Sequence, residues 1–284
     1  MTPTRPGPLP AAQADGTYVL GSHGSELARL QRQHAIWQEA MHQGWQRAGF
    51  GPNQRLLDLG CGPGFASLEL AELVGSQGRV LAIDNAPAFL DLLRQQAQQG
   101  HLPHLEVREH NLAEPLQNGI TPGSWDGAWC RWLALFLPRL DPLLELLARA
   151  LRPGGRLVMH EYLRWDTFSL HPRGEVLSRF VHRCIQHWRE HGGDPDVAQR
   201  LPWLLEERGF RLLHSTSLMA CSGANQPKAR WLQDFLSSYP VQLAAAGLWD
   251  GSDQAALEEE LRWAGRHASL WTTPALVELV WERQ

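Results

Sequence analysis

Three glycines follow an acidic residue where the sequence changes from a strand-like to a helix-like pattern. Asp58 stands inside the apolar run LLDLG, and Gly60, Gly62 and Gly64 occupy alternate positions after it. Glycine lacks a Cβ and adopts positive φ freely, so such a turn can bring a ligand against the main chain. The helix that follows adds free amide groups and the positive end of its dipole. These residue types and their spacing predict a ligand-binding turn.

A dinucleotide is one candidate ligand for such a turn. Dinucleotide sites carry the pattern G-x-G-x-x-G, in which the third glycine lets the helix lie close to the strand. Counted from Gly60 and Gly62, the third position is Phe65, a bulky ring. The pattern of this chain, D-x-G-x-G-x-G, therefore disfavours a nicotinamide dinucleotide.

A second acidic residue, Asp84, ends the next apolar run, RVLAID. A carboxylate there can accept hydrogen bonds from both hydroxyls of a ribose, and its charge strengthens these bonds. The neighbouring Asn85 could share the same ribose. Considered alone, Asp84 could equally cap the helix that begins near Pro87.

His160 and Glu161 are the candidate general bases. They stand at the expected exit of the strand-like run RLVMHEYL, on the edge of the sheet where ligands bind. Either side chain could take a proton from a hydroxyl group or an acidic carbon. The alternative is a capping or surface-exposed pair.

The segment HRCIQHWREHGG places Cys184, His187 and His191 on one helical face. His187 and His191 have the spacing of a metal-binding pair, but the glutamate of the H-E-x-x-H motif is missing between them. No further ligand is evident, so the sequence predicts no metal site.

These residues require a scaffold that brings the ends of several strands together. Strand-like and helix-like runs alternate along the chain, which is typical of a doubly wound, mostly parallel sheet with helices on both faces. Ligands of such sheets bind beyond the carboxyl ends of the strands. We expect seven strands, within the runs RLLDLG, RVLAID, LEVREHN, SWDGAWCRWLALF, RLVMHEYL, FRLLHSTSLMA and PALVELVWER.

The remaining segments suggest how the chain is organised. Residues 1–16, rich in Pro, Gly and Ala, are expected to form a disordered tail. Residues 17–48 are expected to form an N-terminal helical lid, and residues 49–284 one domain. Helical insertions at about 165–192 and 229–267 interrupt this domain, because both segments are too long for simple connections.

Many of the 13 tryptophans lie in the lid and the insertions. They could form the wall of a site for an aromatic or lipophilic substrate, and one could face a cation. Alternatively, they provide the apolar core of helices that have few other large residues. The residues concerned are Trp37, Trp45, Trp165, Trp188, Trp231, Trp249 and Trp263.

Composition limits the possible partners. The 284 residues carry a net charge of −4, which offers no bulk attraction to nucleic acid or to anionic lipid. The opening residues contain no signal-like apolar segment, and no stretch approaches the about 20 apolar residues of a membrane span. The four cysteines lack metal or redox spacing. We therefore expect a cytoplasmic protein with a small-molecule partner; the sequence does not indicate its oligomeric state.

The pattern D-x-G-x-G-x-G resembles motif I of the Rossmann-like (class I) S-adenosylmethionine-dependent methyltransferases. The likeness covers about residues 50–165 well, and the helix and strand through Gly209 and Phe210 more loosely. It implies S-adenosylmethionine as the cofactor. The motif includes Gly64, and the backbone of Gly60, Cys61 and Gly62 would face the methionine part, which Asp58 would fix directly or through water.

The same resemblance implies further cofactor contacts. Asn111 stands where the family usually has an aspartate that accepts a hydrogen bond from the adenine amino group, and Leu112 would lie on the ring. Cys130 and Arg131 match the motif whose backbone borders the methionine end. The segment TYVLGSHGSELARLQRQ is similar to a lid of some small-molecule methyltransferases, in which the tyrosine, here Tyr18, reaches the cofactor.

The sequence thus predicts an enzyme that transfers a methyl group from S-adenosylmethionine to an O-, C- or N-acceptor on a small organic molecule. A nucleic-acid or protein methyltransferase is one alternative. It is disfavoured by the acidic charge and by the run CRWLALFLP, which replaces the Asn/Asp-Pro-Pro-aromatic motif of such enzymes. A non-catalytic protein that binds the same cofactor is the other alternative.

Overall fold

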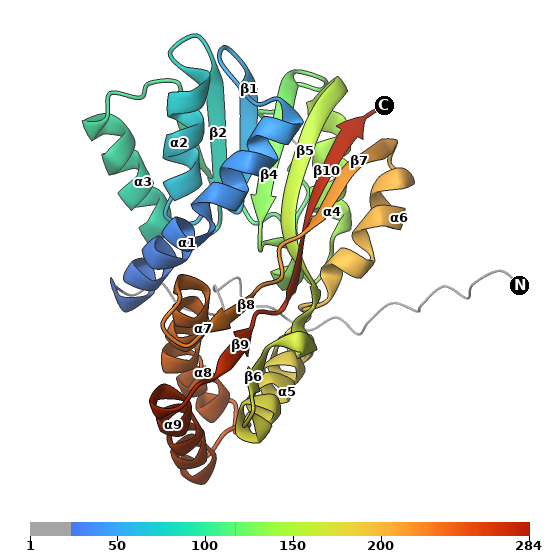
Figure 1. Ribbon diagram of the computed structural model, residues 1–284. Helices are drawn as coiled ribbons and strands as arrows, with labels where there is room; N and C mark the ends of the chain where they lie inside the picture. The colour runs from blue at the N-terminus through green and yellow to red at the C-terminus, as the bar shows by residue number, and fades with distance from the viewer. Residues whose placement is uncertain (1–23, 117) are drawn as a thin grey trace, which may run out of the picture.

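Seven strands of the computed structural model form one sheet in the order β3-β2-β1-β4-β5-β10-β7 (Figure 1). The structure describes residues 24–116 and 118–284. The first five strands are parallel to their neighbours, and β10 runs antiparallel between β5 and β7. The predicted doubly wound, mostly parallel, seven-stranded sheet is confirmed. Its strands are β1 (Arg55–Leu59), β2 (Arg79–Asp84), β3 (Leu105–Glu109), β4 (Trp125–Arg131), β5 (Leu151–Arg164), β7 (Phe210–Ser217) and β10 (Ala275–Arg283).

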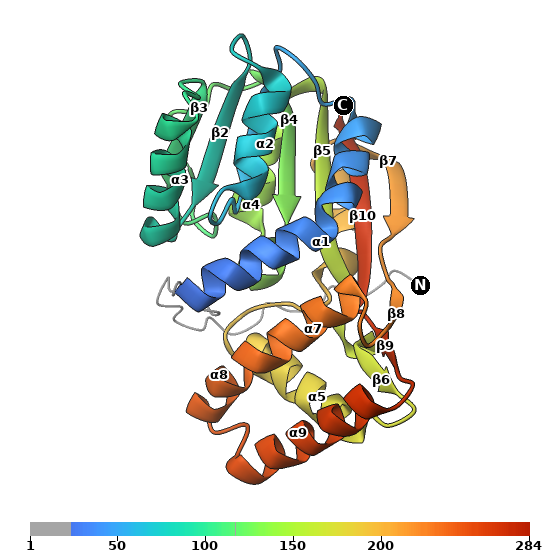
Figure 2. The ribbon, with the colours of Figure 1, turned by 60° about the vertical axis from the view of Figure 1, so that its left-hand side comes forward.

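Helices cover both faces of this sheet (Figures 1 and 2). One face carries α1 (Gly24–Ala48), α2 (Phe65–Val74) and α3 (Pro87–Gln99), and the other carries α4 (Asp141–Ala150) and α6 (Leu201–Glu206). Successive strand side chains point to opposite faces. Leu56 therefore belongs to the core beneath α1 to α3, while Leu57 belongs to the core beneath α4. Because both faces are buried, the central strands are continuous apolar runs.

A second, smaller part stands beyond the carboxyl ends of the parallel strands, where the arrowheads of β2 and β4 point in Figure 2. It contains the helices α5 (Glu175–Glu190), α7 (Pro227–Ser238), α8 (Pro240–Ala245) and α9 (Gly251–Arg266). Helix α1 runs along the boundary and contacts α7. Three short antiparallel strands complete this part: β6 (Ser169–His171), β8 (Cys221–Gly223) and β9 (Leu270–Thr272). This small sheet was not predicted from the sequence.

A buried ionic cluster fastens α1 to the sheet. Nε2 of His160 on β5 lies 2.8 Å from Oε2 of Glu278 on β10, and Nη1 of Arg47 on α1 donates to Oε1 of Glu278 at 2.7 Å. His160 and Glu278 are fully buried. Gly44 lets the helix approach, since a Cβ at this position would clash with the Glu278 carboxylate. The cluster joins one helix to two strands that are distant in sequence.

The sequence predicts no membrane span. Within residues 24–116 and 118–284, no helix has both the length and the apolar character that are needed to cross a bilayer. The expected tail, residues 1–16, and Tyr18 lie outside the described residues.

Candidate active site

A cavity of about 890 Å³ opens at the carboxyl ends of the parallel strands, between the sheet and the second part. This volume lies near the upper end of the range for ligand pockets, about 300–1,000 Å³. The cavity adjoins β1 and β4, where the strand order reverses and where ligands bind to sheets of this kind. The predicted cofactor residues that line it are Asp58, Gly60, Cys61, Gly62, Asp84, Asn85, Asn111, Leu112 and Arg131.

The glycine turn presents bare main chain to this cavity. Gly60 and Gly62 both have positive φ, 73° and 52°. The amides of Gly60 and Cys61 donate to the carbonyl of Ile83 at 2.9 and 3.1 Å, which fixes the turn to β2. A Cβ at Gly62 would meet no atom within 4 Å, so open space lies beside its Cα. A ligand that rests on the peptide requires this space.

Gly64 has a different role from the other two glycines. It does not line the cavity. Its φ is 85°, and a Cβ there would overlap the side chain of Leu93 on α3. Gly64 therefore allows the start of α2 to lie close to α3. The sequence predicts it as a cofactor-binding residue, but in the structure its role is to permit helix packing.

Alanine at Gly64 should mainly lower stability, whereas alanine at Gly62 should mainly weaken ligand binding. Gly64→Ala adds overpacking, at about 1–3 kcal/mol, to the left-handed backbone cost of about 1–2 kcal/mol, so its melting temperature should fall clearly. Gly62→Ala incurs only the backbone cost but places a methyl group on the cavity side, so it should mainly weaken ligand binding. Thermal melts and calorimetric titration of both variants check this, and equal melting temperatures would contradict the assigned roles.

The Asp84 carboxylate is held at the cavity edge by three backbone amides. Oδ1 accepts from the N–H groups of Asn85 and Ala86 at 2.8 and 3.0 Å, and Oδ2 accepts from Gly62 at 2.8 Å. Burial raises the pKa of Asp84, and these three hydrogen bonds act against that rise. A carboxylate has about four acceptor positions. Acceptor capacity therefore remains toward the cavity, so the capping contact and a ligand contact are compatible.

Asp58 is buried beneath the glycine turn. Ser67 Oγ donates to its Oδ2 at 2.5 Å. Burial raises the pKa of Asp58 to about 7, although the hydrogen bond from Ser67 and the charge of Arg131 act in the opposite direction. The Arg131 guanidinium lies over the ring of Trp132, 5.2 Å from its centre, and Nη2 is 3.2 Å from Nδ1 of His34. This end of the cavity thus combines a cation with a carboxyl group that titrates near neutral pH.

Asp58→Asn is expected to change the pH dependence of stability. A raised pKa means that the folded protein binds this proton more tightly than the unfolded chain, so wild-type stability falls as pH rises from about 4 to about 7. The asparagine variant lacks this loss. Relative to wild type, its free energy of unfolding should therefore increase by on the order of 1–4 kcal/mol between pH 4 and pH 8. Urea titrations at both pH values measure this difference, and a pH-independent difference would contradict it.

Asn111 and Leu112 follow β3 on the other side of the glycine turn. Oδ1 of Asn111 accepts from the amide of Ala113 at 3.0 Å, and its Nδ2 donates to Glu114 at 3.3 Å. One lone pair of the Asn111 carbonyl oxygen stays available. Leu112 is buried and, together with Phe89 of α3, gives this side of the cavity an apolar surface. Phe89 was not foreseen from the sequence.

The structure does not place the predicted general bases in the cavity. The sequence put His160 and Glu161 at a strand exit, but β5 continues to Arg164, so both residues lie inside a central strand. His160 is engaged by Glu278. Glu161 is fully buried, and burial raises its pKa to about 8. Neither side chain lines the cavity, so the geometry does not support a role as a base for either.

Glu161 instead supports the loop that follows β4. Its Oε1 accepts from the amides of Leu133 and Ala134 at 3.0 and 2.8 Å. Just before them, Trp132 has a φ of 52°, a rare conformation for a bulky residue that is found at functional sites. Cys130, predicted to border the cofactor, is fully buried and does not line the cavity, so the structure does not place it against a ligand.

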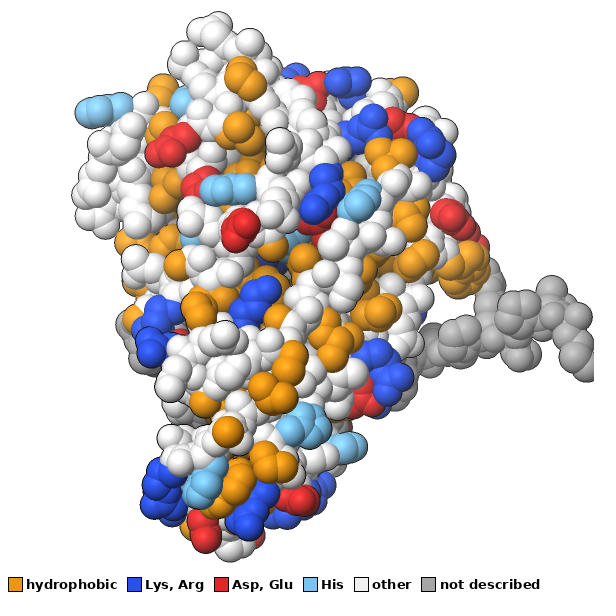
Figure 3. Space-filling view, viewed as in Figure 1, with side chains coloured by type: hydrophobic (Ala, Val, Ile, Leu, Met, Phe, Trp, Pro, Cys, Tyr) orange, Lys and Arg blue, Asp and Glu red, His pale blue; other side chains and the backbone are white. Residues whose placement is uncertain are grey.

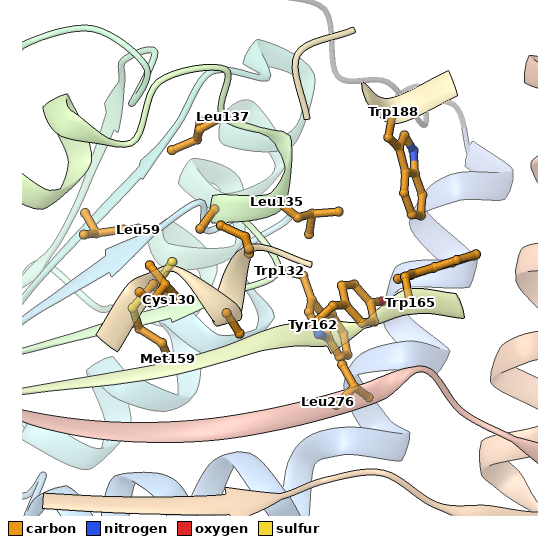
Figure 4. Packing of buried hydrophobic residues seen from close by; sticks show 14 of the residues in the cluster. Leu59, Cys130, Trp132, Leu135, Leu137, Met159, Tyr162, Trp165, Trp188 and Leu276 are labelled. Carbon is orange, nitrogen blue, oxygen red and sulfur yellow. The ribbon is translucent and has the colours of Figure 1, made fainter. Parts of the chain in front are cut away.

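Trp132 begins an aromatic wall inside the cavity. Its ring stacks with Tyr162 of β5 at 6.0 Å and with Trp231 of α7 at 5.6 Å. Figure 4 shows Trp132, Tyr162 and Trp165 side by side, with Trp188 reaching toward Trp165 from α5. Trp132 was not predicted as a site residue. It directly follows Arg131, which the sequence predicts to lie near the cofactor, and this adjacency is the signal that could have identified Trp132.

The structure places some of the tryptophans in the cavity lining and others in the core. Trp165, Trp188 and Trp231 line the cavity, together with Phe168 and Phe235. The remaining lid and insertion tryptophans pack in or against the core outside that lining: Trp37, Trp45, Trp249 and Trp263. The aromatic compartment therefore consists of residues from the loop after β4, from β5 and from the second part.

Comparisons with known proteins agree with this architecture. A family model described as a methyltransferase domain matches residues 51–207. The aklanonic acid methyltransferase of Streptomyces sp. strain C5 is 34% identical over 176 residues, which are 58% of this chain and 78% of that protein. The 2-phytyl-1,4-naphtoquinone methyltransferase of Synechococcus elongatus is 28% identical over 155 residues, 55% of this chain and 61% of that protein. The chain spans only 44–61% of the length of the first five curated relatives.

A solved structure shares the fold over almost the whole length. The geranyl diphosphate C-methyltransferase of Streptomyces coelicolor A3(2) has a TM-score of 0.56 at 17% identity, covering 96% of this chain and 94% of that one. The family model itself covers more than half of the 284 residues, from before β1 to the end of α6. With its sheet order, its glycine turn and this match, the chain belongs to the methyltransferase-domain family.

Proposed function

We propose that this chain transfers a methyl group from S-adenosylmethionine to a small organic molecule. One observation carries the proposal: a single cavity joins the bare main chain at Gly62 and the anchored Asp84 carboxylate to an aromatic compartment. The first end suits a nucleoside cofactor and the second a largely apolar acceptor. A non-catalytic protein that only binds the cofactor would not require the aromatic compartment.

The described residues fit the parts of S-adenosylmethionine. The main chain at Gly60 to Gly62 would receive the methionine part, with Asp58 beneath it. Asp84 would accept from a ribose hydroxyl at the acceptor position that its three backbone contacts leave on Oδ2. The free lone pair of Asn111 would accept from the adenine amino group. When bound, the cofactor supplies a methyl group that its positively charged sulfur already makes electrophilic.

The main task of the protein is then to align the acceptor and to exclude water. Alignment alone can contribute about 7–11 kcal/mol to lowering a reaction barrier. We propose that α1 and the two helical insertions act as the lid over the cavity. The stacked rings of Trp132 and Trp231 favour a planar substrate, a class that agrees with the naphthoquinone in the name of one relative.

We infer a cytoplasmic enzyme that acts on a small molecule. The four cysteines are free thiols, which suits a reducing compartment. On the face shown in Figure 3, basic and acidic side chains are interspersed. With a net charge of −4, this favours a small acceptor over nucleic acid.

Two measurements test the function. In thermal melts, S-adenosylmethionine and its demethylated product should raise the melting temperature by mass action, and NAD should not. Incubation with methyl-labelled cofactor and a panel of phenols, quinones and carboxylic acids should then yield a labelled product. Stabilisation by NAD alone would contradict the cofactor assignment. Cofactor binding without turnover of any acceptor would support the non-catalytic alternative.

A further inference from the structure

Helix α5 presents two histidines to the aromatic compartment. His187 is 6% exposed and lines the cavity, and His191, one turn later, lines it as well. Their ring centres are 4.4 Å apart. Apart from the indole N–H groups, the other polar side chains along the cavity among the described residues of the second part are Gln242 and Glu190, and Oε1 of Glu190 accepts from Gln186 at 2.8 Å. The two rings are therefore the main polar groups on this apolar wall.

The hydrogen bond to Tyr239 fixes the proton of His187. Nδ1 of His187 lies 2.7 Å from the Tyr239 hydroxyl, which is fully buried. Burial raises the pKa of Tyr239, so the phenol keeps its proton. The indole N–H of Trp188, which also interacts with this hydroxyl, can only donate. Among its partners in residues 24–116 and 118–284, the hydroxyl hydrogen therefore has Nδ1 of His187 as its acceptor. In neutral His187 the ring hydrogen is then on Nε2, which makes Nε2 a donor.

His191 has the opposite arrangement. Its Nδ1 lies 2.7 Å from the backbone carbonyl oxygen of His187. A carbonyl oxygen can only accept, so Nδ1 of His191 carries the hydrogen and Nε2 of the neutral ring is an acceptor. Burial, together with the nearby ring of His191, lowers the pKa of His187, which keeps that ring neutral. The pair therefore offers one donor and one acceptor.

The end of α5 is fastened to the loop that borders the glycine turn. The amide of Asp194 donates to the carbonyl of Leu135 at 2.8 Å, and Leu135 lines the same cavity. The Trp188 ring contacts Phe136 edge to face, with centres 6.2 Å apart. The histidine pair is thus held in a fixed relation to the proposed cofactor end.

We propose that His187 and His191 recognise a methyl acceptor that carries a carbonyl oxygen beside a hydroxyl group on an aromatic ring. Nε2–H of His187 donates to the carbonyl oxygen, and Nε2 of His191 accepts the hydroxyl hydrogen. When the hydroxyl oxygen bonds to the methyl carbon, the carbon–sulfur electron pair stays on sulfur and the proton passes to His191. The inference rests on the proposed function and names the substrate class of that same site.

Ring protonation is tested directly by nitrogen-15 NMR of histidine-labelled full-length protein at neutral pH, which distinguishes protonated from bare ring nitrogens. His187 should carry its hydrogen on Nε2 and His191 on Nδ1. In Tyr239→Phe, which removes only the hydroxyl, His187 should lose its preference for this tautomer. A wild-type His187 protonated on Nδ1, or no change in Tyr239→Phe, would overturn the proposal.

Binding of three matched probes tests the recognition itself: 1-hydroxy-2-acetonaphthone, 2-acetonaphthone with the carbonyl only, and 1-naphthol with the hydroxyl only. Wild type should bind the first probe about three- to tenfold more tightly than either of the others. Tyr239→Phe should lower the advantage that the carbonyl confers, and His191→Phe the advantage that the hydroxyl confers. His182→Gln, on the exposed side of α5, is the control and should match wild type.

Equal affinity of wild type for the three probes would overturn the proposal, as would a His191→Phe variant that keeps the full preference. A separate titration with S-adenosylhomocysteine distinguishes this failure from failure of the proposed function. Loss of probe selectivity with intact cofactor binding removes only the histidine assignment. Absence of cofactor binding removes the methyltransferase proposal, whatever the probes show.

Discussion

Alanine in place of Asp84 is expected to lower the affinity for S-adenosylmethionine and for its demethylated product by about 10- to 100-fold at neutral pH. The proposed ribose contact uses a charged acceptor, and a hydrogen bond to a charged group contributes about 1.5–3 kcal/mol. Each 1.4 kcal/mol corresponds to a factor of ten in the dissociation constant. Calorimetric titration of the variant and of wild type measures the effect.

The control is Glu109→Ala. Glu109 is exposed at the end of β3, opposite Asp84 in the strand register, and does not line the cavity. Its removal should leave cofactor affinity unchanged. Because Asp84 also accepts from three backbone amides, a thermal melt must show that Asp84→Ala is folded before titration. A folded variant that binds as wild type does would remove the ribose assignment.

Glu278→Ala is expected to cost about 1–4 kcal/mol of unfolding free energy. This sums about 1–3 kcal/mol for leaving a buried polar group without its hydrogen-bond partner and up to about 1 kcal/mol for an ion pair with a partly exposed arginine. The change leaves His160 buried without its 2.8 Å partner and detaches Arg47 of α1 from β10. Urea titration measures the loss. Glu282→Ala is the control, because Glu282 lies on the same strand but pairs with Arg156 and Arg211, whose side chains reach solvent. Its removal should cost much less, since ion pairs in contact with water contribute little.

This cluster also predicts how acid affects wild type. Burial tends to raise the pKa of Glu278, but the hydrogen bond with His160 and the Arg47 charge lower it overall. A lowered carboxyl pKa stabilises the fold above the unfolded value of 4.5, and this contribution is lost as pH falls through the folded value. Burial lowers the pKa of His160 below 6.5, which adds a loss of stability in the same direction. A Glu278→Ala variant as stable as wild type at neutral pH would contradict the account.

The central sheet and the glycine turn that lines the cavity were predictable because their signals are local. Strands buried on both faces are continuous apolar runs, and a turn that needs positive φ requires glycine at Gly60 and Gly62. The position of Asp84 at the end of β2 was predictable because a few adjacent residues determine where this strand ends. The role of Gly64 was not, since its contact with Leu93 depends on how two helices meet.

The structure does not place the predicted bases in the cavity, because a distant strand sets the length of β5. Leu276 pairs with Tyr162, and Ala275 with Arg164, so β10 extends β5 beyond Glu161. The contact between His187 and Tyr239 similarly joins positions 52 residues apart in the chain. The small sheet consists of three-residue strands, too short for a pattern of alternation. These features depend on contacts between residues that are far apart in the chain, and local sequence patterns do not reveal such contacts.

Calorimetric titration of folded wild type with S-adenosylhomocysteine tests the central claim most directly. The account predicts a saturable heat with one site per chain, an affinity about 10- to 100-fold weaker in Asp84→Ala, and an unchanged affinity in Glu109→Ala. Protein that melts cooperatively yet gives no heat with this ligand or with S-adenosylmethionine would contradict the account.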